Sequence, residues 1–196
     1  MIFNDEGDAA LFSEFLKGNE DAFARIYDIY FPILFHYCIR FTPDRSLIKD
    51  VLQDFFLGLL SRRKRLPEVQ NPGRYLMVSA RRELFRRLTK ASRLPIEAMT
   101  GEDYAFHLEL SPENALIDKQ RGEYQSMHLQ DTINGLTARQ KEAIYLYYYN
   151  NSSYEEIAEI MGLKEVKYAR TLVYRALSEL RLVLKGDGSL LGRIIS

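Results

Sequence analysis

Two carboxylates four residues apart are the first candidates for chemistry in this sequence. Asp50 and Asp54 fall on one face of a helix at that spacing, with Gln53 beside them. Paired carboxylates can perform acid–base catalysis or bind a metal ion. Neither role is favoured, because no histidine and no third carboxylate accompanies them at ligand spacing. The residue pattern by itself therefore favours a solvated helix face for Asp50, Gln53 and Asp54.

Other residue types that perform chemistry are poorly arranged. His36 and the single cysteine, Cys38, are two residues apart in a predicted helix, which does not suit a metal site. The sequence contains no glycine-rich phosphate loop, no Ser/His/Asp set and no Cys/His pairing. We predict no metal, no cofactor and no enzymatic activity.

Basic and aromatic side chains share one face of the helix predicted over residues 74–90, whose opposite face is apolar. Arginines interleaved with an aromatic ring suit single-stranded or melted DNA, through phosphate pairing and base stacking. The candidate contacts on this face are Tyr75, Ser79, Arg82, Arg86 and Lys90.

A helix-turn-helix pattern precedes a second basic helix. Residues 154–163 have the pattern of a short helix with Ser152 or Ser153 as its N-cap, ended by a turn at Gly162. One face of the next helix is apolar at three- and four-residue steps. The other face bears side chains of the types that contact phosphates and base edges in a major groove. These are Lys164, Lys167, Thr171, Tyr174, Arg175 and Ser178, with Arg170 at the margin as a phosphate contact.

The elements that must position these residues are all predicted to be helices. A first helix ends near Gly18, and a second begins after Asn19 and is kinked or divided at Pro32. A third, capped by Ser46, runs to about residue 61. Residues 91–112 have poor periodicity and several helix breakers. We predict an all-α fold of two helical domains, residues 1–92 and 113–196, joined by a flexible acidic linker at residues 93–112.

The charge is segregated along the chain, although 27 Lys+Arg balance 27 Asp+Glu. Residues 62–93 contain eleven basic and two acidic residues, and residues 164–185 contain six and two. Residues 97–118, which lie between them, contain six acidic residues and no Lys or Arg. This pattern indicates two contacts with a polyanion, with two solvated helix faces as the alternative.

The sequence shows no signal peptide and no membrane span, so we predict a cytoplasmic protein without stable membrane insertion.

Both motif regions resemble extracytoplasmic-function sigma factors of the sigma-70 family. LTARQKEA (136–143), YEEIAEIMGL (154–163) and YRALSELR (174–181) resemble region 4, and the aromatic pattern of residues 23–37 with DVLQDFF (50–56) resembles region 2. The resemblance covers about residues 10–90 and 113–185. When Gly162-Leu163 and Tyr174-Arg175-Ala176 are both matched to region 4, one extra residue remains near Lys164. The side chains that lead the recognition helix therefore stay open.

The resemblance implies a function. Region 2 of such factors docks on the β′ clamp of core RNA polymerase through a Gln–acid cluster, here Asp50, Gln53 and Asp54. Its basic helix and the preceding loop recognise and melt the −10 element, and one base is flipped into a pocket. Gln70 and Asn71, in the loop at residues 66–71, are the candidate readers of that base. Region 4 binds the −35 element and the β flap. The expected partners are core RNA polymerase, promoter DNA and an anti-sigma factor.

Two other classes of protein stay open. A helix-turn-helix regulator that binds duplex DNA without polymerase accounts for residues 113–185 but leaves the Asp50–Asp54 cluster unused. A helical adaptor with no DNA role leaves the charge segregation unexplained.

Overall fold

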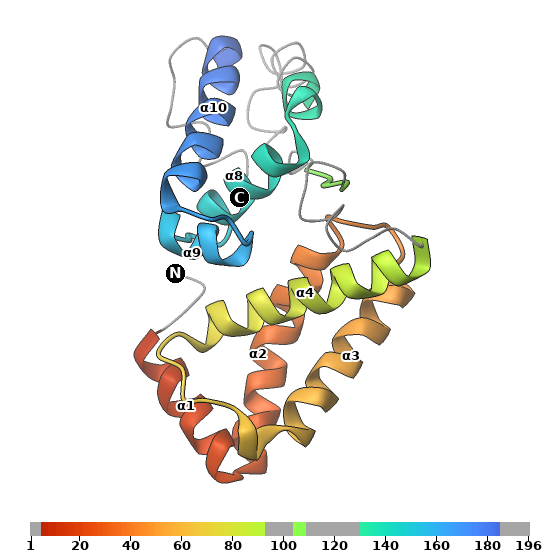
Figure 1. The fold of residues 1–196 in the computed structure, drawn as a ribbon, viewed down its shortest axis with the longest axis vertical. Coiled ribbons are helices and arrows are strands. Elements are labelled where there is room, and N and C mark those ends of the chain that lie inside the picture. The colour runs from red at the N-terminus through yellow and green to blue at the C-terminus, as the bar shows by residue number, and fades with distance from the viewer. Residues whose placement is uncertain (1–4, 93–103, 109–129, 185–196) are drawn as a thin grey trace, which may run out of the picture. The chain divides into compact units, whose positions relative to one another are not determined.

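The computed structural model describes residues 5–92, 104–108 and 130–184, and every regular element in these ranges is helical (Figure 1). The all-α prediction is therefore confirmed. The chain divides into two compact units, Met1–Asp103 and Tyr104–Ser196. Among the described residues, no helix is long and apolar enough to cross a membrane.

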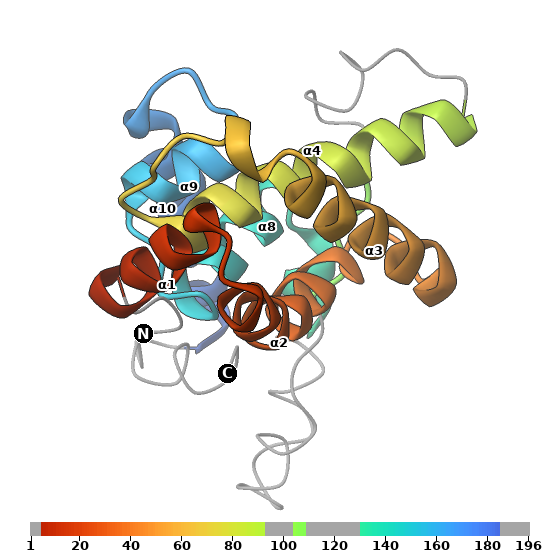
Figure 2. The same ribbon diagram turned by 90° about the horizontal axis from the view of Figure 1, so that it is seen from below.

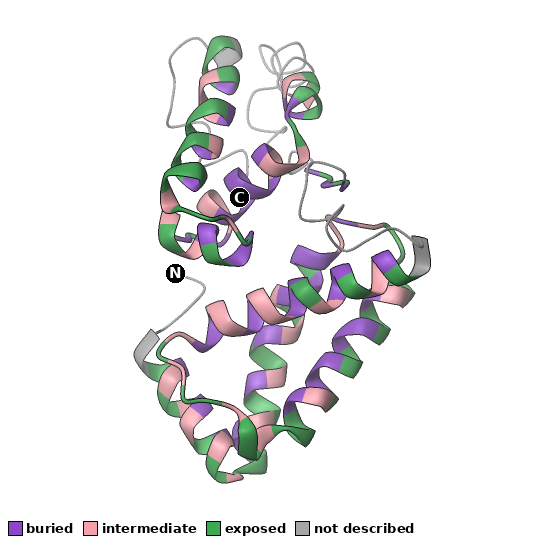
Figure 3. Cartoon of the chain, in the orientation of Figure 1, coloured by how far each residue is buried: buried purple, intermediate pink, exposed green. Residues whose placement is uncertain are grey.

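The first unit is built from α1 (Asp5–Lys17), α2 (Glu20–Cys38), α3 (Arg45–Ser61), the short 3-10 helix η1 (Arg63–Arg65) and α4 (Pro72–Ser92). Helix α4 packs against α1, α2 and α3, and α2 packs against α1 and α3 (Figures 1 and 2). Figure 3 shows the buried residues as stripes along these helices. The largest fully buried side chains of this unit are Phe12, Phe15, Ile26, Tyr30, Leu34, Tyr37, Ile48, Leu52, Phe56, Leu59 and Leu76.

Local signals fix the helix ends in the first unit. Gly18, with a φ of 110°, ends α1, and the Asn19 side chain accepts a hydrogen bond from Ala22 N at 3.2 Å, which confirms the predicted cap of α2. The cap of α3 is Asp44, whose Oδ1 accepts from Leu47 N at 2.9 Å, and not Ser46 as predicted. An aspartate one residue before the helix is better placed to accept from its first turn than a serine inside that turn.

Helix α2 is not divided at Pro32, which corrects one of the two outcomes that we predicted there. A proline inside a helix leaves the carbonyl four residues earlier, that of Asp28, without its helical donor. Both Asp28 and Pro32 are exposed, so water can hydrogen-bond to that carbonyl. The helix continues because the missing bond lies on its solvated side.

The second unit is built from residues 104–108, helical residues 130–135, α8 (Ala138–Tyr148), α9 (Tyr154–Ile160) and α10 (Val166–Leu184). Helix α10 packs against both α8 and α9. Capping boxes begin α8 at Thr137 and α9 at Ser153, which settles the choice between Ser152 and Ser153. The core includes Ile144, Tyr145, Leu146, Ile157, Ala169, Val173, Ala176 and Leu180.

Five residues that we predicted as linker pack in the second unit instead. Tyr104, Phe106 and Leu108 are buried. The Tyr104 hydroxyl donates to the carboxylate of Glu142, which is fully buried, and the Phe106 ring meets Tyr145 edge to face at 5.7 Å. This unit therefore begins at Tyr104 and not at residue 113. The remaining residues of the predicted linker lie outside the described ranges.

Candidate nucleic-acid interface

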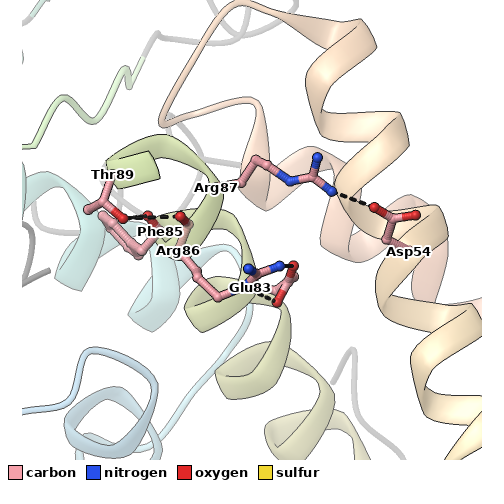
Figure 4. Close-up of polar contacts among 6 residues, drawn as sticks. All are labelled: Asp54, Glu83, Phe85, Arg86, Arg87 and Thr89. Atoms are coloured by element: carbon pink, nitrogen blue, oxygen red, sulfur yellow. Dashed lines mark hydrogen bonds and ion pairs between the residues drawn. The ribbon is translucent and has the colours of Figure 1, made fainter. Parts of the chain in front are cut away.

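The polar face of α3 contains the three residues predicted to form a binding surface. Asp50, Gln53 and Asp54 are all exposed, whereas the residues between them, Val51 and Leu52, are buried. The structure thus brings the three side chains together on one face. The Asp54 carboxylate also forms an ion pair with Arg87 of α4 (Figure 4). This acid, unlike a freely solvated one, already has a partner within the chain.

The exposed face of α4 contains the residues predicted to contact melted DNA. Arg82, Arg86 and Lys90 are exposed, while Tyr75 and Ser79 are half-buried. Tyr75 meets Phe12 of α1 edge to face, with ring centroids 6.0 Å apart. This contact limits the motion of the tyrosine ring.

Arg86 forms a two-point pair with Glu83 on the same helix (Figure 4). Its Nε donates to Oε2 at 3.0 Å and its Nη2 to Oε1 at 2.5 Å. This hydrogen-bonded pairing holds the pKa of Glu83 below its usual value, with smaller effects from the charges of Arg87 and Arg62, and it raises the pKa of Arg86. Arg86 is therefore less available to a phosphate than its sequence position indicates.

An open groove of about 620 Å³ lies between α3 and α4. Asp54, of the predicted docking set, lines it together with Tyr75, Ser79, Arg82 and Arg86, of the predicted DNA set. Phe55, Leu59, Arg62 and Glu83 complete the lining. The two predicted surfaces of this unit therefore share a border. In the described part of the chain, no group of three or more His, Cys, Asp or Glu could hold a metal ion.

The loop before α4 places its two predicted base readers differently. Gln70 is exposed and borders a second cavity, of about 380 Å³, that Phe12 and Leu16 of α1 also line. The Oδ1 of Asn71 accepts a hydrogen bond from Arg74 N at 2.8 Å. The Asn71 oxygen thus caps the start of α4, a role that the turn before the helix could have indicated.

The turn between α9 and α10 has the geometry of a helix-turn-helix. Gly162 has a φ of 65°, and the two hydrogen bonds that close the end of α9 run from Leu163 N to Ala158 O and from Gly162 N to Glu159 O, at 2.8 and 3.2 Å. Helix α10 begins only at Val166. Lys164, which we predicted on the recognition helix, lies in the turn before it.

Most of the predicted base-reading face of α10 is open to solvent. Lys167, Arg170, Thr171, Tyr174 and Arg175 are exposed, and Ser178 is half-buried. Several of these side chains already have partners.

Lys167 Nζ lies 2.8 Å from the Glu165 carboxylate, and the Thr171 hydroxyl donates to the Lys167 carbonyl. The Arg170 guanidinium lies 5.5 Å from the centre of the Tyr154 ring, on the first helix of the motif. Arg175 forms no ion pair with any acid among the described residues, and the Tyr174 side chain is 69% exposed.

Sequence reasoning missed several residues of these surfaces. Tyr168 is 44% exposed on α10, and a helical wheel could have placed it there. The pairing of Glu83 with Arg86 could also have been predicted from the sequence, because the two residues are three positions apart on one helix. Arg81 is buried, with its guanidinium 4.3 Å from the centre of the Phe85 ring, so the charge count of residues 62–93 overstates the charge on the surface.

Comparison with known families agrees with this arrangement. Residues 26–94 match the model for Sigma-70 region 2, and residues 126–180 match the model for Sigma-70, region 4. The chain is also 29% identical over 174 residues to the ECF RNA polymerase sigma factor BldN of Streptomyces coelicolor. The chain is an extracytoplasmic-function member of the sigma-70 family. The match covers 87% of this chain but 63% of BldN, so this sigma factor spans just under two thirds of that relative's length.

Solved structures share the fold of this sigma factor. One is CnrH in complex with the cytosolic domain of CnrY, with a TM-score of 0.58 and 18% identity, covering 93% of this chain and 100% of the other. Another is the sigma factor RpoE in complex with the anti-sigma factor NepR from Bartonella quintana, with a TM-score of 0.55 and 22% identity, covering 84% and 98%. All of the predicted contact residues of this sigma factor lie within the two matched regions.

Proposed function

We propose that this sigma factor binds core RNA polymerase and directs promoter-specific initiation of transcription. One observation supports this most: two exposed basic surfaces lie on separate compact units, one within each matched region. Two separated DNA contacts suit a promoter that has two recognition elements. The protein then supplies specificity to an enzyme and catalyses no reaction itself, and it acts in the cytoplasm.

The first unit is proposed to bind polymerase and the −10 element. The exposed Asp50, Gln53 and Asp54 side chains provide an acidic and amide surface for the β′ clamp. The adjoining groove and the exposed face of α4 provide arginines and an aromatic ring for the strand that is displaced when the −10 element melts. Gln70, exposed beside a cavity in the preceding loop, is proposed to read a flipped base.

The second unit is proposed to bind the −35 element and the β flap. Helix α10 follows the turn of the helix-turn-helix and exposes basic, hydroxyl and aromatic side chains, which suits insertion into a major groove. Tyr174 and Arg175, which are the least engaged within the chain, are the leading candidates for base contacts. Arg170, held toward the first helix of the motif, is better placed for a phosphate.

Run-off transcription with core RNA polymerase tests the proposal. Fragments of the source genome serve as templates, because the promoter need not be known in advance. Defined transcripts are expected only when the protein is added. Duplex binding without transcripts would indicate a regulator that works outside polymerase, and neither binding nor transcripts would indicate an adaptor.

We also propose that an anti-sigma factor binds this protein. Support comes from the two solved structures of like fold: RpoE is bound to the anti-sigma factor NepR, and CnrH to the cytosolic domain of CnrY. The product of a neighbouring gene, purified and added to the run-off assay, should abolish transcription in a one-to-one ratio. Transcription that persists at saturating amounts of each neighbouring product would contradict this partnership.

A further inference from the structure

Two tyrosine rings connect the last turn of α8 to the recognition helix. Tyr147 of α8 and Tyr154, the first residue of α9, are stacked, with ring centroids 5.3 Å apart and planes 20° from parallel. The guanidinium of Arg170 on α10 lies 5.5 Å from the centre of the same Tyr154 ring. We propose that Tyr147 and Tyr154 are positioning residues for the −35 contact, because their stack orients Arg170 toward a DNA phosphate. The inference deepens the proposed function and rests on it for the identity of the DNA.

The orientation of the Arg170 side chain depends on this stack. Arg170 is exposed, and it forms no hydrogen bond or ion pair with any residue that the structure describes. Its contact with the Tyr154 ring is a cation–π interaction, in which the positive charge is attracted to the negative face of the ring. An arginine side chain has several rotatable bonds. A contact that already limits their motion reduces the entropy that is lost when the guanidinium binds a phosphate.

Local structure holds the Tyr154 ring in place. The capping box of Ser153 and Glu156 fixes the backbone at the start of α9. The stacked Tyr147 ring then limits rotation of the Tyr154 ring, and both rings are half-buried. Burial raises the pKa of Tyr154, hydrogen bonding to Tyr147 raises it further, and the charge of Arg170 acts in the opposite direction. The Tyr154 phenol is therefore neutral at neutral pH and does not repel a phosphate.

A second stacked tyrosine pair at the same end of α8 provides a matched control. Tyr145 and Tyr149 have ring centroids 4.9 Å apart and planes 15° from parallel. Tyr149 is half-buried, like Tyr147, but it contacts no cationic side chain among the described residues. A substitution of Tyr149 therefore removes a stacked tyrosine ring from this helix end without changing the surroundings of Arg170.

A double-mutant cycle on the full chain tests the positioning role. Binding to a fluorescent DNA duplex of mixed sequence is measured by anisotropy at several salt concentrations, since a phosphate contact does not depend on sequence. R170Q should make the slope of log K against log salt shallower by about 0.9. Y147L should weaken binding about two- to tenfold, as expected when one long side chain must be ordered on binding, and should leave the slope unchanged. In the R170Q chain, Y147L should have no further effect.

Three further variants complete the test. Y147F keeps the ring that stacks on Tyr154 and should retain the wild-type affinity, as should Y149L. Y154L removes the ring that Arg170 contacts, so it tests the same stack from its other end if Y147L does not fold. A purely structural Tyr147 would give equal losses from Y147L in the wild-type and R170Q chains. That result would overturn the proposal, as would equal losses from Y147L and Y149L.

The duplex assay and the run-off assay distinguish the two proposals. Coupling between Tyr147 and Arg170 without any transcript would support the stack and reject the sigma-factor function. Defined transcripts together with independent effects of Y147L and R170Q would reject the stack and leave the function standing.

Discussion

At the scale of single residues, Glu83 is an acid placed among arginines that are expected to bind DNA. It neutralises Arg86 through two hydrogen bonds. E83Q removes that charge, so we expect tighter binding of single-stranded DNA and a salt slope about 0.7 steeper. Because the pKa of Glu83 is lowered in the folded protein, its pairing stabilises the fold at neutral pH, and this contribution is lost as the pH falls through the lowered pKa. Fluorescence anisotropy across a salt series measures the binding.

The control for E83Q is E14Q. Glu14 forms the same kind of pair, three residues from Lys17 at 2.8 Å, on α1 and outside the groove lining. Its removal adds the same net charge without freeing an arginine in the groove. Equal gains in affinity from both variants would mean that only the net charge of the chain matters.

Asp54 belongs to the proposed polymerase-docking face and also forms an ion pair with Arg87 of α4. The double variant D50K/D54K should lose binding to core polymerase, because both carboxylates of the docking face are reversed. R87Q breaks the ion pair but keeps the Asp54 carboxylate, so it should retain binding. Both changes are at partly exposed positions, where folding stability typically moves by about 0.5 kcal/mol. Co-purification with core enzyme measures the difference, and unchanged recovery of D50K/D54K would contradict the assignment of this face.

At the scale of elements, the turn between α9 and α10 depends on a left-handed backbone at Gly162. An L-residue other than glycine in this region costs about 1–2 kcal/mol. G162A should therefore destabilise the second unit by about 1 kcal/mol. G135A is the matched control, because Gly135 is helical and a Cβ there meets nothing within 4 Å, so it should be neutral or stabilising. Urea unfolding of the full chain compares them, and equal effects would mean that the turn is not the determinant.

The recognition helix makes a separate prediction about promoter choice. R175A should cost about 1–3 kcal/mol of binding to the preferred −35 sequence and relax the preference at one base pair. R170A should weaken binding evenly across sequences. The Arg170 side chain is held toward Tyr154, a position that favours a contact with the DNA phosphates over a contact with a base. Selection from a randomised −35 library by the holoenzyme distinguishes the two. A change of base preference from R170A alone would transfer the reading role to that arginine.

At the scale of the whole molecule, the second unit includes residues 104–108, so it begins earlier in the sequence than we predicted. Tyr104 donates its hydroxyl hydrogen to the buried carboxylate of Glu142. A hydrogen bond to a charged group contributes about 1.5–3 kcal/mol, so Y104F should lower the stability of the second unit by about that amount. Hydrogen exchange should accelerate at the amides of α8 and stay unchanged in α2. Acceleration in neither helix would mean that this segment adds nothing to the unit.

The sequence by itself determined the helical fold and the approximate helix boundaries, because these depend on local signals. Asn19 acts through its side-chain oxygen on the first turn of α2, and Gly162 acts through its own left-handed backbone. The apolar periodicity of α3 and α10 fixes which faces are buried. The same periodicity correctly placed Arg82 and Arg175 on exposed faces.

Only the tertiary structure decided which residues from different helices meet on these surfaces. Arg87 meets Asp54 across 33 residues of sequence, and Arg62 joins Arg82 in one groove, because α3 and α4 pack side by side. Tyr104 joined the second unit through a partner 38 residues away. Periodicity specifies the face of a helix but not the helix that packs against it, so contacts between distant segments are fixed only when the core assembles.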